Sequence, residues 1–149
     1  MSEHPIVHLD SCLFIALFKA EVGRAQICRA IIEDASTGKI HAGISTLAIA
    51  ETRRPLGLEK DVSELLLQPF FRKSSLDLKI AKLARDLLEK IPGLKGADAV
   101  HLATAMDAGA KWLMTYDTQL LKCNRNPFVG KIEITEPSRP WDSQLILPL

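Results

Sequence analysis

The sequence predicts an α/β domain in which helices cover a mainly parallel sheet. Short apolar runs rich in β-branched residues alternate with helical segments of about a dozen residues. Of the 149 residues, 47% are hydrophobic and 25% are charged, as in an ordinary globular domain. No apolar run approaches the roughly 20 residues of a membrane span. We expect one domain over residues 1–149, with its core at 6–134 and an extended tail at 135–149.

The N-terminal part of this pattern predicts a strand followed by two helices. Residues 6–9 are a short apolar run that indicates a buried strand. Asp10 or Ser11 can cap a helix over residues 13–17. Apolar residues recur at helical spacing over residues 24–35, and Gly38 is a plausible end for that second helix.

The middle of the chain predicts the next strand and helix pairs. Residues 40–44 indicate a strand, and Ser45 or Thr46 caps a helix that carries Glu51 and ends before Pro55. Residues 56–68 are expected to form a helix and its loops. A third strand is expected to begin at Phe70 and Phe71.

The C-terminal part is expected to contain two long helices and two strands. Residues 76–90 carry an apolar stripe, given by Leu76, Ile80, Leu83, Leu87 and Leu88. A second helix is expected over residues 97–108, ended by glycine. Strands are expected at 112–116 and 131–134.

Charge and cysteine content limit the classes of function. The formal net charge is +1, so any nucleic-acid contact requires a local basic patch. Three cysteines lack a CxxC or zinc-site spacing and indicate reduced thiols in a cytoplasm. Residues 1–5 show no signal-peptide pattern. Neither a GxGxxG nor a Walker sequence is present, which disfavours a doubly wound cofactor-binding domain.

Four acidic residues fall where such a sheet builds its site. Asp10 and Asp117 follow predicted strands, Asp98 lies in the first turn of a helix, and Glu51 lies in the helix after the second strand. Strand C-termini and helix N-termini share one edge of a parallel sheet. The sequence therefore predicts these carboxylates at one end of the molecule.

Each acid also has a simpler explanation. Asp10, Asp98 and Asp117 could each serve only as a helix cap or first-turn acid. Glu51 has apolar neighbours, and an ion pair with Arg53 or Arg54 is the rival account of it. If the carboxylates converge, cations must neutralise them, and a hard oxygen set favours Mg²⁺ or Mn²⁺. Such ions can promote phosphodiester hydrolysis.

Specific motifs around these acids resemble the PIN-domain family, and within it the VapC-type toxins. The segment Lys95-Gly96-Ala97-Asp98-Ala99-Val100-His101-Leu102-Ala103-Thr104-Ala105 is similar to the family's acid-bearing helix, and Thr115-Tyr116-Asp117 is similar to its last acidic motif. The segments 7–11 and 45–51 match its first two acids. The resemblance covers about residues 6–134, whereas 53–71 and the tail match no family pattern.

The resemblance implies a three-layer α/β/α fold and a Mg²⁺- or Mn²⁺-dependent endoribonuclease. It implies that Asp10, Glu51, Asp98 and Asp117 are the metal-binding and catalytic acids. Ser11 and Thr115 match the hydroxyl residues that hold those acids by hydrogen bonds.

It also favours a toxin with a cognate antitoxin and a homodimer. The leucines at 65–67 and the stripe on 76–88 could serve a dimer or partner, although core packing explains them equally well.

Basic residues near the predicted edge could contact RNA phosphates, chiefly Arg53, Arg54 and Lys95. His101, one turn after Asp98, is expected to have a core or supporting role. The alternatives are an RNA-processing PIN nuclease without an antitoxin and a non-catalytic module that binds RNA or protein.

Overall fold

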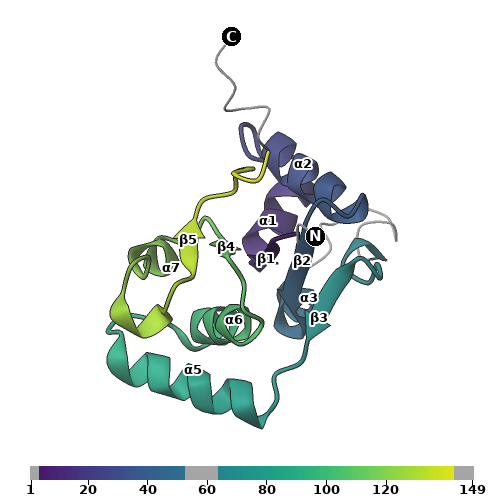
Figure 1. Ribbon diagram of the computed structural model, residues 1–149. Coiled ribbons are helices and arrows are strands. Elements are labelled where there is room, and N and C mark those ends of the chain that lie inside the picture. Colours follow the sequence, from purple (N-terminus) through teal and green to yellow (C-terminus); the bar gives the residue numbers. More distant parts are fainter. Residues whose placement is uncertain (1–3, 53–63, 143–149) are drawn as a thin grey trace.

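The sheet is all-parallel, with strand order β3-β2-β1-β4-β5, in the computed structural model, which describes residues 4–52 and 64–142 (Figure 1). This confirms the α/β class predicted from the alternating strand and helix patterns. The five strands are β1 (Ile6–Leu9), β2 (His41–Ser45), β3 (Phe71–Ser74), β4 (Trp112–Met114) and β5 (Glu133–Thr135).

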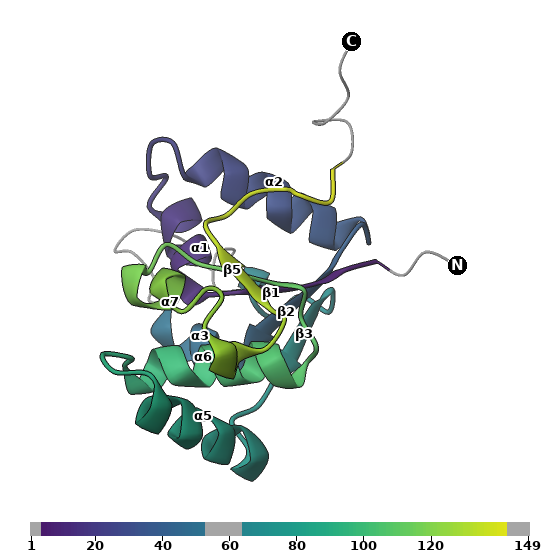
Figure 2. The ribbon, with the colours of Figure 1, turned by 60° about the vertical axis from the view of Figure 1, so that its left-hand side comes forward.

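Helices cover both faces of this sheet. Figure 2 shows α1 and α2 above the sheet and α5 and α6 below it. In the described residues none of the helices is long and apolar enough to cross a bilayer. The helices are α1 (Ser11–Phe18), α2 (Ala25–Ser36), α3 (Thr46–Glu51), α5 (Leu78–Lys90), α6 (Gly96–Asp107), α7 (Thr118–Lys122) and the 3-10 helix η1 (Pro127–Val129).

Strand register separates the core into two halves. Val7 pairs with Ala42 and Trp112, and this row packs with apolar side chains from α1 and α2. The next row contains His8 and Leu113, and Leu113 packs instead with side chains from α5 and α6. Successive side chains of a strand point to opposite faces, so each short strand contributes to both halves.

The predicted element boundaries differ from the structure in two informative places. The helix expected at 76–90 begins at Leu78, because the Asp77 side chain accepts a hydrogen bond from the amide of Ile80. The strand expected at 112–116 ends at Met114, and Asp117 caps the unpredicted helix α7. Of the helix expected over 56–68, residues 56–63 lie outside the described residues.

The apolar stripe expected on residues 76–90 is only partly buried. Ile80 and Leu87 lie in the core, whereas Leu76 and Leu88 are exposed. Leu76 precedes the start of α5, and α5 packs mainly against α6. Among the leucines at 65–67, Leu66 is buried and Leu67 is exposed. These exposed leucines lie outside the core of the described residues.

The first part of the C-terminal tail is attached to α2 through one buried acid. Asp34 is only 4% exposed and accepts hydrogen bonds from Arg139 Nε at 2.7 Å and Nη2 at 3.0 Å. The indole Nε1 of Trp141 donates to the same carboxylate at 2.8 Å. These three donors compensate the burial of the charge and tie residues 139–141 to the layer of α1 and α2.

Replacing Asp34 with Asn should lower the free energy of unfolding by about 3 kcal/mol, because a buried ion pair loses one charge. Urea unfolding followed by circular dichroism measures this change. Asp107→Asn is the matched control, since Asp107 pairs with the exposed Lys79 at 2.7 Å. The control should lose less than about 1 kcal/mol. Equal losses in the two variants would contradict a buried tail anchor.

Candidate functional site

Asp10 is held at the carboxyl end of β1 by donors from three other residues. The Ser11 amide donates to Oδ1 at 2.8 Å, which makes Asp10 the N-cap of α1. The Thr115 hydroxyl donates to Oδ2 at 2.7 Å from beyond the adjacent strand β4. The Ser11 hydroxyl lies at a long 3.5 Å from Oδ1, and its hydrogen bond to Glu51 helps to lower the pKa of that second acid.

Cys12 is the third of these donors and was not anticipated from the sequence. Its thiol donates to Asp10 Oδ2 at 3.3 Å, and its sulfur accepts from the Tyr116 amide at 3.2 Å. Burial and the charge of Asp10 raise the pKa of Cys12 to about 12, so the thiol keeps its proton. Its position two residues after a strand-end aspartate is the signal that could have identified it.

Glu51 and Asp10 meet around the buried ring of His101. His101 Nε2 lies 2.6 Å from Glu51 Oε1 and 3.5 Å from Asp10 Oδ1. One ligand atom from each of the three residues lies within 4.8 Å of the others. Glu51 is at the C-terminal end of α3, and His101 lies in α6, so two helices bring these groups together.

The contact with His101 determines the protonation of Glu51. This hydrogen bond, opposed by partial burial, lowers the pKa of Glu51. Burial alone would lower the pKa of His101, but the hydrogen bond with Glu51 and the charge of Asp10 raise it overall. The pair is therefore stabilised as a carboxylate beside an imidazolium. The rival partners of Glu51, Arg53 and Arg54, lie outside the described residues.

Asp98 lies in the first turn of α6, three residues before His101. Its Oδ2 atom is buried and, in the described part of the chain, has no hydrogen-bond partner. Burial, followed by the charges of Asp117 and Asp10, raises the pKa of Asp98 to about 6. A buried carboxylate oxygen without a donor is expensive to keep ionised. This atom is therefore the clearest indication that the cluster has a missing positive partner.

Asp117 faces the same cluster while it caps α7. Its Oδ1 accepts from the amides of Gln119 at 2.9 Å and Leu120 at 3.0 Å. Its own amide donates to the Thr115 hydroxyl at 2.9 Å, so one side chain connects Asp117 with Asp10. The charge of Asp117 is one cause of the raised pKa of Asp98.

The four predicted acids thus lie at one edge of the sheet. Asp10 and Asp117 cap helices, and Asp98 is the first-turn acid of α6, as the simpler explanation of these acids expected. Lys95, predicted as an RNA contact, is exposed at the start of α6, where its charge acts on Asp98.

The chemistry of this cluster fits a divalent cation. Asp10, Glu51 and His101 form a group whose ligand atoms lie close enough to hold one ion, and nearby Asp98 Oδ2 has no hydrogen-bond partner in the described residues. Burial and the charges of Asp117 and Asp10 disfavour the ionised form of Asp98, and a cation would relieve this cost. As an imidazolium, His101 would support the carboxylates and would not itself bind the ion, which leaves a set of oxygen ligands.

A family model and several solved structures match most of this chain. The model of the PIN domain family matches residues 7–126. A toxin-antitoxin complex from Klebsiella pneumoniae has a similar chain at TM-score 0.61 and 22% identity, covering 89% of this chain and 98% of that one.

Two further solved structures share the fold. VapC20 of Mycobacterium tuberculosis, a sarcin-ricin loop cleaving toxin, has TM-score 0.61 and 16% identity, covering 75% of this chain and 90% of that one. FitAcB from Neisseria gonorrhoeae has TM-score 0.57 and 19% identity, covering 88% and 97%. The search of curated proteins found no match.

Asp98→Asn should stabilise the metal-free protein at neutral pH. The pKa of Asp98 is raised to about 6 in the folded state from 3.8, so the folded protein binds more protons between these values. Wild-type stability therefore falls as pH rises from 3.8 to about 6, and the amide variant escapes this loss. Thermal unfolding with EDTA across this range measures the difference.

The advantage of Asp98→Asn should be largest above pH 6 and shrink as pH falls toward 3.8. Asp86→Asn, the same change on the exposed surface of α5, should show no such pH dependence. Added Mn²⁺ should stabilise the wild type more than Asp98→Asn. A pH-independent effect of Asp98→Asn would argue against a repulsive acidic cluster.

Thr115→Val tests the hydroxyl that joins Asp10 and Asp117. Removing it should lower the free energy of unfolding by about 1–3 kcal/mol, because buried groups lose a partner. It should also weaken Mn²⁺ binding by about 10–100-fold, as loss of a ligand-orienting group does. Calorimetric Mn²⁺ titration measures the affinity. Thr104→Val removes an equally buried hydroxyl elsewhere in the core and should leave the Mn²⁺ affinity unchanged.

Proposed function

Because the chain belongs to the PIN-domain family, we propose that it is a metal-dependent endoribonuclease. The observation that carries the proposal is the buried Oδ2 of Asp98, which has no hydrogen-bond partner in the described residues and belongs to a carboxyl whose pKa is raised by burial and by the charges of Asp117 and Asp10. Asp10, Glu51, Asp98 and Asp117 would together hold Mg²⁺ or Mn²⁺. Such a cation would polarise the scissile phosphodiester and lower the pKa of the attacking water.

The residues around the acids supply orientation. Asp10 is fixed by donors to both of its oxygens, from Ser11 and Thr115, so its carboxylate direction is set before any ligand arrives. His101 holds Glu51 through Nε2 and keeps it ionised near neutral pH. We assign His101 as a positioning residue, because it touches the acids from the buried side.

Asp98 is the acid that must change its protonation. With a pKa of about 6, it is partly protonated in mildly acidic solution and must lose that proton to serve as a full ligand. Metal affinity should therefore rise with pH through this range. The exposed Lys95 beside it favours the ionised form and would also attract a phosphate.

Exposed cations around the site would contact the RNA backbone. Lys95 lies at the start of α6. Arg24 lies with its guanidinium 4.2 Å from the ring centre of Tyr116, the residue before Asp117. We propose Lys95 and Arg24 as phosphate contacts. Arg53 and Arg54 remain proposed contacts although they lie outside the described residues.

We further propose that the enzyme is the toxin of a toxin-antitoxin pair, acting in the cytoplasm. Support comes from the structural likeness to a chain in a Klebsiella pneumoniae toxin-antitoxin complex and to VapC20. A cognate antitoxin and a homodimer are the partners this proposal requires. Leu76, which precedes α5, and Leu88, which lies in α5, are both exposed. Such partners could cover them.

The central test is cleavage of total RNA by purified protein with Mg²⁺, with Mn²⁺ or with EDTA. The wild type should cut at discrete positions only with a divalent cation. Asp98→Asn should lose more than about 100-fold in rate, since losing a metal ligand exceeds the effect of losing its supporting groups. Mapping the new RNA ends identifies the substrate.

Asp86→Asn provides the matched control and should cleave as the wild type does. Expression in bacteria tests the toxin assignment, because growth arrest should accompany wild type and Asp86→Asn but not Asp98→Asn. Cleavage without growth arrest would favour an RNA-processing nuclease that has no antitoxin. If RNA is equally intact after incubation with folded wild type and with folded Asp98→Asn in the presence of metal, the result would favour a non-catalytic module.

A further inference from the structure

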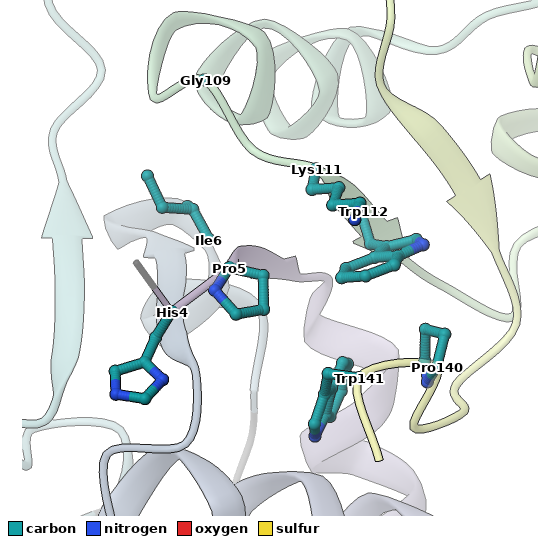
Figure 3. Close-up of a pocket in the computed structure, with 8 residues that line it drawn as sticks. All are labelled: His4, Pro5, Ile6, Gly109, Lys111, Trp112, Pro140 and Trp141. Atoms are coloured by element: carbon teal, nitrogen blue, oxygen red, sulfur yellow. The ribbon is translucent and has the colours of Figure 1, made fainter. Parts of the chain in front are cut away.

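A pocket lies at the end of the sheet opposite the acidic site, where β1 and β4 begin. Its volume of about 480 Å³ is within the range of about 300–1,000 Å³ that small-molecule sites occupy. The lining combines the segment before β1, the start of β4 and residues 140–141, which follow β5 (Figure 3). Its residues are His4, Pro5, Ile6, Gly109, Lys111, Trp112, Pro140 and Trp141.

The pocket contains both tryptophans of the chain. Their ring centroids lie 5.9 Å apart at an interplanar angle of 59°. Trp112 Nε1 donates to Glu133 at 3.1 Å, and Trp141 Nε1 donates to Asp34 at 2.8 Å. These hydrogen bonds fix both indoles and use their only polar groups. The indoles can therefore contact a ligand only through their ring surfaces.

The charge of the pocket lining is positive. Lys111 and His4 are its ionisable members, and none of the lining residues is acidic. The ammonium of Lys111 lies 4.6 Å from the ring centre of Trp112, and within residues 4–52 and 64–142 it forms no ion pair. The neighbouring carboxylates of Glu133 and Asp34 each accept a hydrogen bond from one indole. The exposed ammonium is therefore placed for an anionic group.

We propose that this pocket binds a nucleotide, with its base on the indole of Trp141 and its phosphate at Lys111. Aromatic faces bind bases without regard to sequence, and an ammonium binds phosphate as a point charge. The nucleotide can be free or part of an RNA strand. The inference does not rest on the proposed nuclease activity, because the two sites lie at opposite ends of β1 and β4.

The occupied indole N–H groups argue against an extended peptide. A peptide strand brings backbone carbonyls that need donors, but both indoles already donate to carboxylates. The backbone amide of Lys111 is also used, since it donates to the Ile6 carbonyl at 2.8 Å. A nucleotide base with a phosphate needs only the indole ring faces and the Lys111 ammonium, which these hydrogen bonds leave available.

Intrinsic tryptophan fluorescence tests the proposal directly, because its two sources both line the pocket. Full-length protein in EDTA is titrated with AMP, adenosine, inorganic phosphate and a short oligoadenylate, with excitation where bases do not absorb. AMP should quench saturably. Lys111→Ala should weaken AMP binding about tenfold or more, the effect of losing a charge-assisted contact. Adenosine binding should not change in that variant.

Two sets of variants guard against indirect effects. Lys82→Ala removes an exposed lysine from α5 and should bind AMP as the wild type does. Trp141→Phe keeps a flat ring and should retain binding by calorimetry, whereas Trp141→Leu should lose it. Thermal melting establishes that each variant is folded. Asp98→Asn should bind AMP normally, which separates this site from the acidic one.

The outcomes divide clearly. Binding of the oligoadenylate but not of AMP supports the site as one for a nucleotide within RNA, and binding of both supports free nucleotide as well. Absence of binding by either overturns the proposal, and so does quenching that Lys111→Ala leaves unchanged. Binding of a proline-rich peptide in place of nucleotides would overturn it in favour of peptide docking. None of these results alters the test of RNA cleavage.

Discussion

The burial of a carboxylate beside other carboxylates at one edge of the sheet is the constraint on which the rest of the site depends. The parallel order of β2, β1 and β4 brings Glu51, Asp10 and Asp117 to this edge, and the start of α6 adds Asp98. Burial and neighbouring charges raise the pKa of Asp98 to about 6. The fold therefore keeps unfavourable electrostatic energy that a divalent cation would relieve. Natural proteins accept such local costs mainly where a site needs them.

The surrounding contacts hold the acids in place despite that cost. Thr115 joins Asp10 to Asp117, and the ring of His101 joins Asp10 to Glu51. The helices of the site contribute as well, because Asp10 and Asp117 each cap one. Secondary structure and site geometry thus depend on the same hydrogen bonds. A change at one of these acids should consequently affect folding, metal affinity and catalysis to different extents.

Much of this arrangement could be predicted from local sequence. The strand before Asp10, the helix that carries Asp98 and the parallel sheet follow from apolar runs and turn residues. Helix α7 was missed because five residues give too short a pattern. The Cys12 and His101 contacts depend on rotamers and on distances between elements, which a single sequence does not contain. The nucleotide pocket was equally hidden, since its lining comes from three distant segments.

The most direct test of the central claim is a crystal structure of the protein soaked with Mn²⁺, with anomalous diffraction used to locate the ion. We expect a strong anomalous peak coordinated by Asp10 and by Asp98 Oδ2, the buried atom that has no hydrogen-bond partner in the described residues. We also expect that the peak weakens or disappears in Asp98→Asn crystals. An empty acidic cluster at saturating Mn²⁺, or a peak unchanged by that substitution, would contradict the central claim.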